Sequence, residues 1–130
     1  MNLLLDTHVL LWWLEGSRQL GLRAKRDLFL PGVTLWISAA VVWEITIKVG
    51  AGRLKLRKPP AEIIPSLIER GFQALPINID HALAIRHLPA IHNDPFDRML
   101  VAQAQSEGLT LVTADPAVAA YDVRTIDASK

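Results

Sequence analysis

Residues 33–44 have the sequence VTLWISAAVVWE. The β-branched and aromatic run Val33–Ile37 predicts a buried strand. Ser38 is suited to cap a helix that we expect over residues 39–49, and Gly50 supplies a stop for it. A strand that leads directly into a capped helix is typical of an α/β fold.

Short apolar runs and longer helical patterns alternate on both sides of this segment. Further strands are predicted over residues 3–5, 72–77, 109–113 and 123–126, and further helices over residues 7–14, 20–30, 61–70, 79–88 and 95–107, with a short one opened by Pro116. Parallel strands need crossover connections, which helices usually supply. We therefore expect a single α/β domain, residues 1–130, with a parallel sheet covered on both faces.

The composition limits the chemistry of the chain. Apolar residues make up 51% of it, and the mean hydropathy of +0.25 favours buried parallel strands or an apolar partner surface. The formal net charge is only +1, so nucleic-acid binding would depend on local clusters of cations. The absence of cysteine leaves Asp, Glu and His as ligands for a hard metal ion. With no recognisable signal peptide or membrane span, we expect a cytoplasmic protein without membrane contact.

Four acids are expected at one edge of the sheet. Asp6 and Asp115 follow predicted strands, and Glu44 and Asp97 lie on helices that can reach the same edge, where α/β sheets bind ligands. Clustered carboxylates repel one another unless they share protons or a cation. Because oxygen ligands suit Mg²⁺, the sequence predicts a magnesium site at this edge.

Each acid also has a purely structural interpretation. Asp6 and Asp115 are suited to cap the helices that follow them. Asp94 is a still stronger cap candidate, which would put Asp97 in the first helical turn, where the helix dipole favours negative charge. Glu44 can pair with the lysine four residues later on a solvated face. The residues alone leave both interpretations open.

Basic residues and histidines near these acids have two interpretations as well. The stretch between Glu44 and Glu62 contains no acid and is either a solvated connector or a track for phosphates; its cations are Lys48, Arg53, Lys55, Arg57 and Lys58. His8 and His92 lack the helical spacing of paired metal ligands, so we expect them to support the acids or to lie on the surface.

Four pieces of the sequence resemble those of a known family in the same order. They are LDTH at residues 5–8, SAAVVWEI at 38–45, DPFDRMLVAQA at 94–104 and LVTAD at 111–115. Together they resemble the PIN-domain family, in particular the VapC-type toxins of type II toxin–antitoxin systems. The third piece is the most specific of the four.

The resemblance implies a three-layer α/β/α sandwich and endonucleolytic cleavage of RNA that depends on Mg²⁺ or Mn²⁺. The family's acidic quartet corresponds to Asp6, Glu44, Asp97 and Asp115, which are the expected catalytic and metal-binding residues. Three further residues are expected to support the quartet: Thr7, Thr113 and Asp94, the last either as an extra ligand or only as a helix cap. His8 stands where many relatives carry asparagine.

The resemblance also implies partners, namely an RNA substrate, a second copy of the chain in a homodimer, and a cognate antitoxin that masks the acids. Arg98, Lys48 and Arg53 are candidate contacts to the RNA, although Arg98 would also fit a salt bridge on the helix surface. One alternative function is a phosphoacceptor signalling domain, which is disfavoured because no acidic pair follows the first strand and no lysine follows residues 109–113. The other is a catalytically silent PIN-like binding module.

Overall fold

Five parallel strands form the centre of the protein in a computed structural model that describes all of residues 1–130. They are β1 (Asn2–Leu5), β2 (Thr34–Ser38), β3 (Gln73–Leu75), β4 (Thr110–Thr113) and β5 (Thr125–Asp127). The strands lie in the order β3-β2-β1-β4-β5, with Leu4 of β1 opposite Trp36 on one side and Leu111 on the other. This arrangement confirms the predicted α/β class and the parallel sheet.

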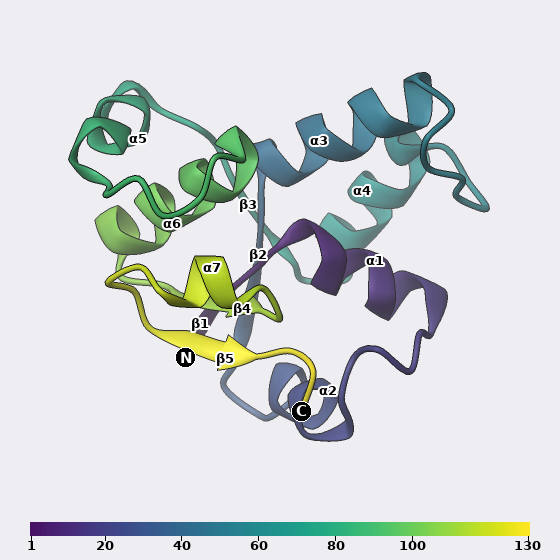
Figure 1. The fold of residues 1–130 in the computed structure, drawn as a ribbon. Coiled ribbons are helices and arrows are strands. Elements are labelled where there is room, and N and C mark those ends of the chain that lie inside the picture. Colours follow the sequence, from purple (N-terminus) through teal and green to yellow (C-terminus); the bar gives the residue numbers. More distant parts are fainter.

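Helices cover both faces of the sheet. They are α1 (Thr7–Glu15), α2 (Leu22–Leu28), α3 (Ala39–Gly50), α4 (Pro60–Glu69), α5 (Ile79–Ala84), the 3₁₀ turn η1 (Ile85–His87), α6 (Pro95–Glu107) and α7 (Pro116–Ala119). Figure 1 shows α5, α6 and α7 on one side of the strands and α1, α3 and α4 on the other. The expected three-layer sandwich is therefore present. None of the helices has the length and apolar character needed to cross a membrane.

The central strands are apolar along their whole length because both of their faces are covered. Side chains alternate between the two faces of a strand, and yet Leu3, Leu4 and Leu5 of β1 are all at most 1% exposed. Leu111 and Val112 of β4 are completely buried as well. Burial on both faces explains why these strands are continuous apolar runs rather than alternating patterns.

Two predicted elements end early because of proline. The helix expected over residues 79–88 is α5 followed by η1, which ends at His87 because Leu88 precedes Pro89 and adopts an extended conformation. The strand expected over residues 72–77 is only β3, which ends before Pro76.

Two other elements differ because of pairing elsewhere in the chain. The helix expected over residues 20–30 is the shorter α2, whose N-cap Gly21 has no side chain for capping and donates its N–H to the carbonyl of Ala128. The strand expected over residues 123–126 is β5, shifted toward the C-terminus, where Thr125 pairs with Leu111 of β4.

The direction of winding across the sheet reverses between β1 and β4. The chain leaves β1 through α1 on one face and leaves β4 through α7 on the other (Figure 1). Ligands of open α/β sheets bind beyond the carboxyl ends of the strands at such a point. Asp6 and Asp115, which follow these two strands, therefore lie where a ligand site is expected.

Candidate active site

Asp6 lies at the end of β1 and caps α1. Its Oδ1 accepts a hydrogen bond of 2.9 Å from the N–H of Val9. The residue is nevertheless only 4% exposed, and this burial raises the pKa of Asp6, while hydrogen bonds from Thr113 and Val9 oppose the effect. A carboxylate on the protein surface can also cap a helix, so capping does not explain why the carboxyl of Asp6 is buried. Its burial therefore indicates a second role.

Glu44 lies on α3 and faces the interior. Its Oε1 accepts a hydrogen bond of 2.6 Å from the Thr7 hydroxyl, and its Oε2 lies 2.6 Å from Nζ of Lys48. The pair with Lys48 thus forms as the helical spacing predicts. Glu44 is only 4% exposed, however, so the pair is not the solvated surface contact of the structural interpretation.

Asp94 and Asp97 occupy the start of α6. Asp94 caps the helix, since its Oδ1 accepts from the N–H groups of Phe96 at 2.8 Å and of Asp97 at 3.1 Å. Burial is the main cause that raises the pKa of Asp97 to about 7, and the negative charges of Asp94, Asp6 and Glu44 add to it. Acids from three different segments therefore act on the same carboxyl group.

Thr113 and Asp115 bring the end of β4 to the same cluster. The Thr113 hydroxyl accepts from the N–H of Asp115 at 3.1 Å and hydrogen-bonds to Asp6. Asp115 caps α7 through Oδ1, which accepts from the N–H of Ala117 at 2.9 Å. Its Oδ2 remains available and points to His92.

His92 joins two acids of the cluster, which is the supporting position that the sequence left open beside a place on the surface. Its Nε2 lies 3.0 Å from Oδ2 of Asp97 and 3.0 Å from Oδ2 of Asp115. One ligand atom from each of the three residues falls within 4.8 Å of the others. The nearness of His92 to Asp94 in the sequence was the only signal, because a loop rather than a helix positions the ring.

The hydrogen bond at Nδ1 of His92 determines whether Nε2 can donate a proton or bind a metal ion. Nδ1 accepts the N–H of Asp94 at 3.2 Å, so a neutral ring carries its proton on Nε2. That proton is donated to Oδ2 of Asp115, and Oδ2 of Asp97 lies at the same distance of 3.0 Å from Nε2. A metal-ligating Nε2 would require the opposite tautomer, so the geometry favours His92 as a hydrogen-bond donor to the acids.

Arg98 holds the loop that carries His92. Its guanidinium donates to the carbonyl oxygens of Pro89 at 3.0 Å and His92 at 3.3 Å and to the hydroxyl of Tyr121 at 3.2 Å. The Tyr121 hydroxyl in turn accepts the N–H of His92 at 2.8 Å. These bonds occupy much of the donor capacity of Arg98, and its expected contact to RNA stays a prediction.

The remaining candidates lie at the rim of the cluster or outside it. Lys48 reaches the cluster through Glu44, whereas Arg53 is exposed on the connector after α3 and forms no ion pair. His8 is exposed on the first turn of α1, and its positive charge, when protonated, lowers the pKa of Asp6. The structure therefore brings together the four acids, Thr7, Thr113, Asp94 and Lys48, but not Arg53.

The donor set fits a hard divalent cation. All of its ionisable members except His92 and Lys48 are carboxylates, and carboxylate oxygens are the ligands that Mg²⁺ and Mn²⁺ prefer. Three helices, α1, α6 and α7, also begin at the cluster, and their N-terminal dipole ends favour negative charge there. Without a cation, burial and mutual repulsion disfavour the ionised form of Asp97.

A family model described as the PIN domain matches residues 3–124 of the chain. No protein with a curated description matches the sequence.

Solved structures with the same fold include toxin–antitoxin proteins. VapBC2 from Rickettsia felis, bound to a DNA fragment from its promoter, superimposes with a TM-score of 0.75 at 14% identity, over 98% of each chain. DNA-bound VapBC from Salmonella typhimurium gives a TM-score of 0.72 at 18% identity, also over 98% of each chain. A toxin–antitoxin complex from Klebsiella pneumoniae gives 0.62 at 21% identity, over 95% of this chain and 94% of that one. At these identities the similarity establishes the fold.

Proposed function

Because the chain belongs to the PIN domain family and gathers four carboxylates at the switch point of its sheet, we propose that it is a metal-dependent endoribonuclease. We further propose that it is the VapC-type toxin of a toxin–antitoxin pair. The observation that carries the proposal is the convergence of acids from separate segments: Asp97 and Asp115 both lie 3.0 Å from His92 Nε2, and Asp6 and Glu44 are close enough to Asp97 for their charges to repel it. A bound divalent cation would offset this repulsion.

The residues around the cluster have distinct roles in this proposal. Asp6 and Asp97 would hold the principal Mg²⁺ or Mn²⁺ ion, and Glu44 and Asp115 would be direct or water-mediated ligands. A cation bound there lowers the pKa of a coordinated water and neutralises charge on the scissile phosphate. The Thr7 hydroxyl, 2.6 Å from Glu44, fixes the orientation of that carboxylate.

The proposed substrate and products follow from the same arrangement. Water is the nucleophile, so hydrolysis of an RNA phosphodiester leaves a 5′-phosphate and a 3′-hydroxyl. Lys48 neutralises one oxygen of Glu44 and can also attract a phosphate that approaches the cluster. Analysis of the product termini distinguishes this chemistry from attack by the RNA 2′-hydroxyl, which would leave a phosphate on the 3′ side.

Two protein partners belong to the proposal. A cognate antitoxin would bind the toxin and mask the acids, and a second copy would form a homodimer. The solved VapBC and toxin–antitoxin complexes that share this fold support the first proposal. Exposed apolar side chains support the second, since Trp43 is 59% and Ile68 38% exposed.

A cleavage assay tests the proposed activity. A pool of structured RNAs is incubated with the protein in Mg²⁺, Mn²⁺ or EDTA, beside Asp6→Asn and Asp97→Asn. Asp80→Asn, at an exposed acid of α5, is the matched control. We expect cleavage with metal, its loss in EDTA and in both cluster variants, and its retention in the control.

Other outcomes would separate the alternatives. Cleavage that survives EDTA or both cluster variants would contradict the metal–carboxylate mechanism. RNA binding without cleavage in any metal would support the silent binding module. Growth arrest on expression, if it depends on Asp6 and Asp97, supports the toxin role, whereas equal arrest by the variants contradicts it. The phosphoacceptor alternative stays disfavoured, because a single acid follows β1 and no lysine follows β4.

A further inference from the structure

A recess lies at the end of α1 that is opposite the acids. Its volume is about 460 Å³, and it is lined by Leu14, Glu15, Lys55, Leu56, Arg57, Lys58 and Ile63. Leu14 and Glu15 belong to the last turn of α1, Ile63 to α4, and the other four to the connector between α3 and α4. Nothing in the proposed catalytic chemistry uses this recess.

The cations of the recess have no protein partner. None of Lys55, Arg57 and Lys58 takes part in an ion pair, and all three are exposed. Glu15 is the only acid of the lining, and no acid occurs between Glu44 and Glu62. The connector therefore carries a local excess of positive charge in a protein whose net charge is only +1.

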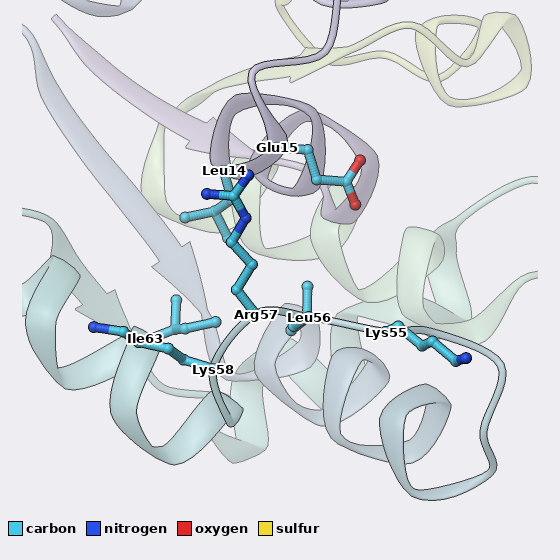
Figure 2. Close-up of a pocket in the computed structure, with 7 residues that line it drawn as sticks. All are labelled: Leu14, Glu15, Lys55, Leu56, Arg57, Lys58 and Ile63. Atoms are coloured by element: carbon cyan, nitrogen blue, oxygen red, sulfur yellow. The ribbon is translucent and has the colours of Figure 1, made fainter.

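The directions of these side chains distinguish between possible anions. Figure 2 shows Lys55 and Lys58 extending to opposite sides of the connector, while Arg57 reaches between them toward Leu14. A single bound anion requires donors that converge on one point. Cations that are spread along an exposed segment instead suit a chain of phosphates laid across them, because each phosphate needs only a nearby positive charge.

The recess and the acidic cluster lie at the two ends of α1. Asp6 caps the start of α1 and Glu15 ends it, so the two sites are separated by about 13 Å at the helical rise of 1.5 Å per residue. A stacked nucleic-acid strand, with one phosphate about every 3.4 Å, covers this distance in about four nucleotides. On α3, Lys48 already pairs with Glu44 on the way to the connector.

We propose that Lys55, Arg57 and Lys58 form a binding track for the phosphate backbone of single-stranded RNA on its way to the acids. This inference rests on the proposed ribonuclease function and extends it. Leu14, Leu56 and Ile63 form an apolar floor beneath the cations, against which a sugar or base edge packs. The track contributes affinity without sequence selection, since phosphates carry no sequence information.

Salt-dependent RNA binding tests the track directly. The Asp97→Asn background prevents cleavage, and the affinity for a short fluorescein-labelled single-stranded RNA is measured by anisotropy between about 50 and 200 mM salt. Each phosphate contact on a single strand contributes about 0.7 to the slope of log affinity against log salt. The triple variant Lys55→Gln, Arg57→Gln, Lys58→Gln should therefore reduce that slope by about 2.

A matched triple variant controls for the loss of net charge. This control combines Arg18→Gln, Arg23→Gln and Lys25→Gln. It also removes three exposed cations without ion pairs, but none of these residues lines the recess. It should keep the slope of the parent. If the track triple does not fold, the double variant Lys55→Gln, Lys58→Gln changes only two exposed side chains and should give about two-thirds of the effect.

Three outcomes would overturn the track. One is an unchanged slope in the track triple, and a second is an equal loss in both triples, which would indicate a general charge effect. The third is a track triple that binds RNA as its parent does but no longer binds an antitoxin, which would assign the recess to a protein partner. Failure of the parent to bind and cleave RNA would instead reject the ribonuclease function itself. In the cleaving protein, the track triple should raise KM and leave kcat at saturating RNA unchanged.

Discussion

Asp115 uses its two carboxylate oxygens for different purposes. Oδ1 caps α7, while Oδ2 accepts from His92 and faces the acidic cluster. Asp6 likewise caps α1 with Oδ1 alone. From the sequence, helix capping and membership of the acidic cluster were two alternative interpretations of these residues. The geometry makes them compatible, because a helix N-terminus holds one oxygen in place and leaves the other free.

The raised pKa of Asp97 predicts a pH-dependent stability in metal-free protein. The pKa of this carboxyl is 3.8 in the unfolded chain and is raised to about 7 in the folded protein. The folded state therefore binds more protons between these two pH values. Its contribution to stability is present below about pH 4 and is lost as the pH rises to about 7. Asp97→Asn removes this loss, so in EDTA its Tm should rise relative to the parent as the pH increases over that range.

Thermal unfolding in EDTA at several pH values measures this difference. Asp80→Asn, at an exposed position, should shift Tm by the same amount at every pH. Saturating Mn²⁺ should raise the Tm of the parent more than that of Asp97→Asn, because a ligand stabilises the state that binds it. A Tm difference between Asp97→Asn and the parent that stays constant with pH would contradict the raised pKa.

His92 predicts an effect on metal affinity. A single nitrogen 3.0 Å from both Asp97 and Asp115 keeps the two carboxylates close together. Loss of a partner that orients metal ligands typically weakens metal binding about 10- to 100-fold. We expect His92→Ala to weaken Mn²⁺ binding within this range in calorimetry, and His92→Gln, which keeps an N–H donor, to lie nearer the parent. Unchanged or tighter binding in His92→Ala would mean that the ring does not organise the acids.

At the level of elements, a buried polar network joins the helices that carry the acids. Gln103 of α6 is completely buried, accepts from the Ser38 hydroxyl at 2.5 Å and donates to the carbonyl of Pro76 at 3.2 Å. Ser38 also caps α3. The network therefore fixes the start of α3, which carries Glu44, against α6, which carries Asp97.

Gln103→Leu should destabilise the protein by about 1–3 kcal/mol, because it leaves the O–H of the buried Ser38 without an acceptor. Urea unfolding measures the change in the free energy of unfolding. Gln105→Leu, on an exposed face of the same helix, should cost about 0.5 kcal/mol or less. Equal losses in the two variants would show that the network adds nothing beyond the loss of a glutamine.

The elements were predictable where local signals decide them, and less so where the rest of the fold does. The caps at Ser38 and Asp94 and the apolar runs of β1 and β4 correctly identified their helices and strands. The end of η1 at His87 depends on Pro89, a signal present in the sequence but outweighed by the helical pattern before it. The start of α2 depends on pairing between Gly21 and Ala128, which no local pattern contains.

At the level of the whole molecule, topology made the acidic cluster predictable, whereas the sequence left two positions open for His92. Parallel strands align their carboxyl ends, so Asp6 and Asp115 could be placed at one edge because each follows a predicted strand. His92 belongs to the loop between η1 and α6, and its position depends on the bond that its N–H donates to the Tyr121 hydroxyl and on the bond that its Nδ1 accepts from the N–H of Asp94. The Tyr121 contact joins residues 29 positions apart, so no local pattern in the sequence contains it.

The proposed homodimer can be tested at an apolar groove beside the cluster. A groove of about 530 Å³ between α3, α4 and β3 is lined almost entirely by apolar residues, among them Trp43 and Ile68. Trp43 is 59% exposed and packs edge-on against Phe96, with ring centroids 5.1 Å apart, next to the start of α6. An exposed apolar surface of this kind favours association with another protein surface.

We expect light scattering to give the mass of a dimer for the parent and a smaller mass for Trp43→Lys, because burying an unpaired ammonium in an apolar interface is unfavourable. Leu22→Lys is the matched control, since Leu22 is 86% exposed but lies on α2, outside the groove. It should remain dimeric. A monomeric parent would reject the homodimer, whereas a dimer that persists in Trp43→Lys would locate the interface elsewhere on the molecule.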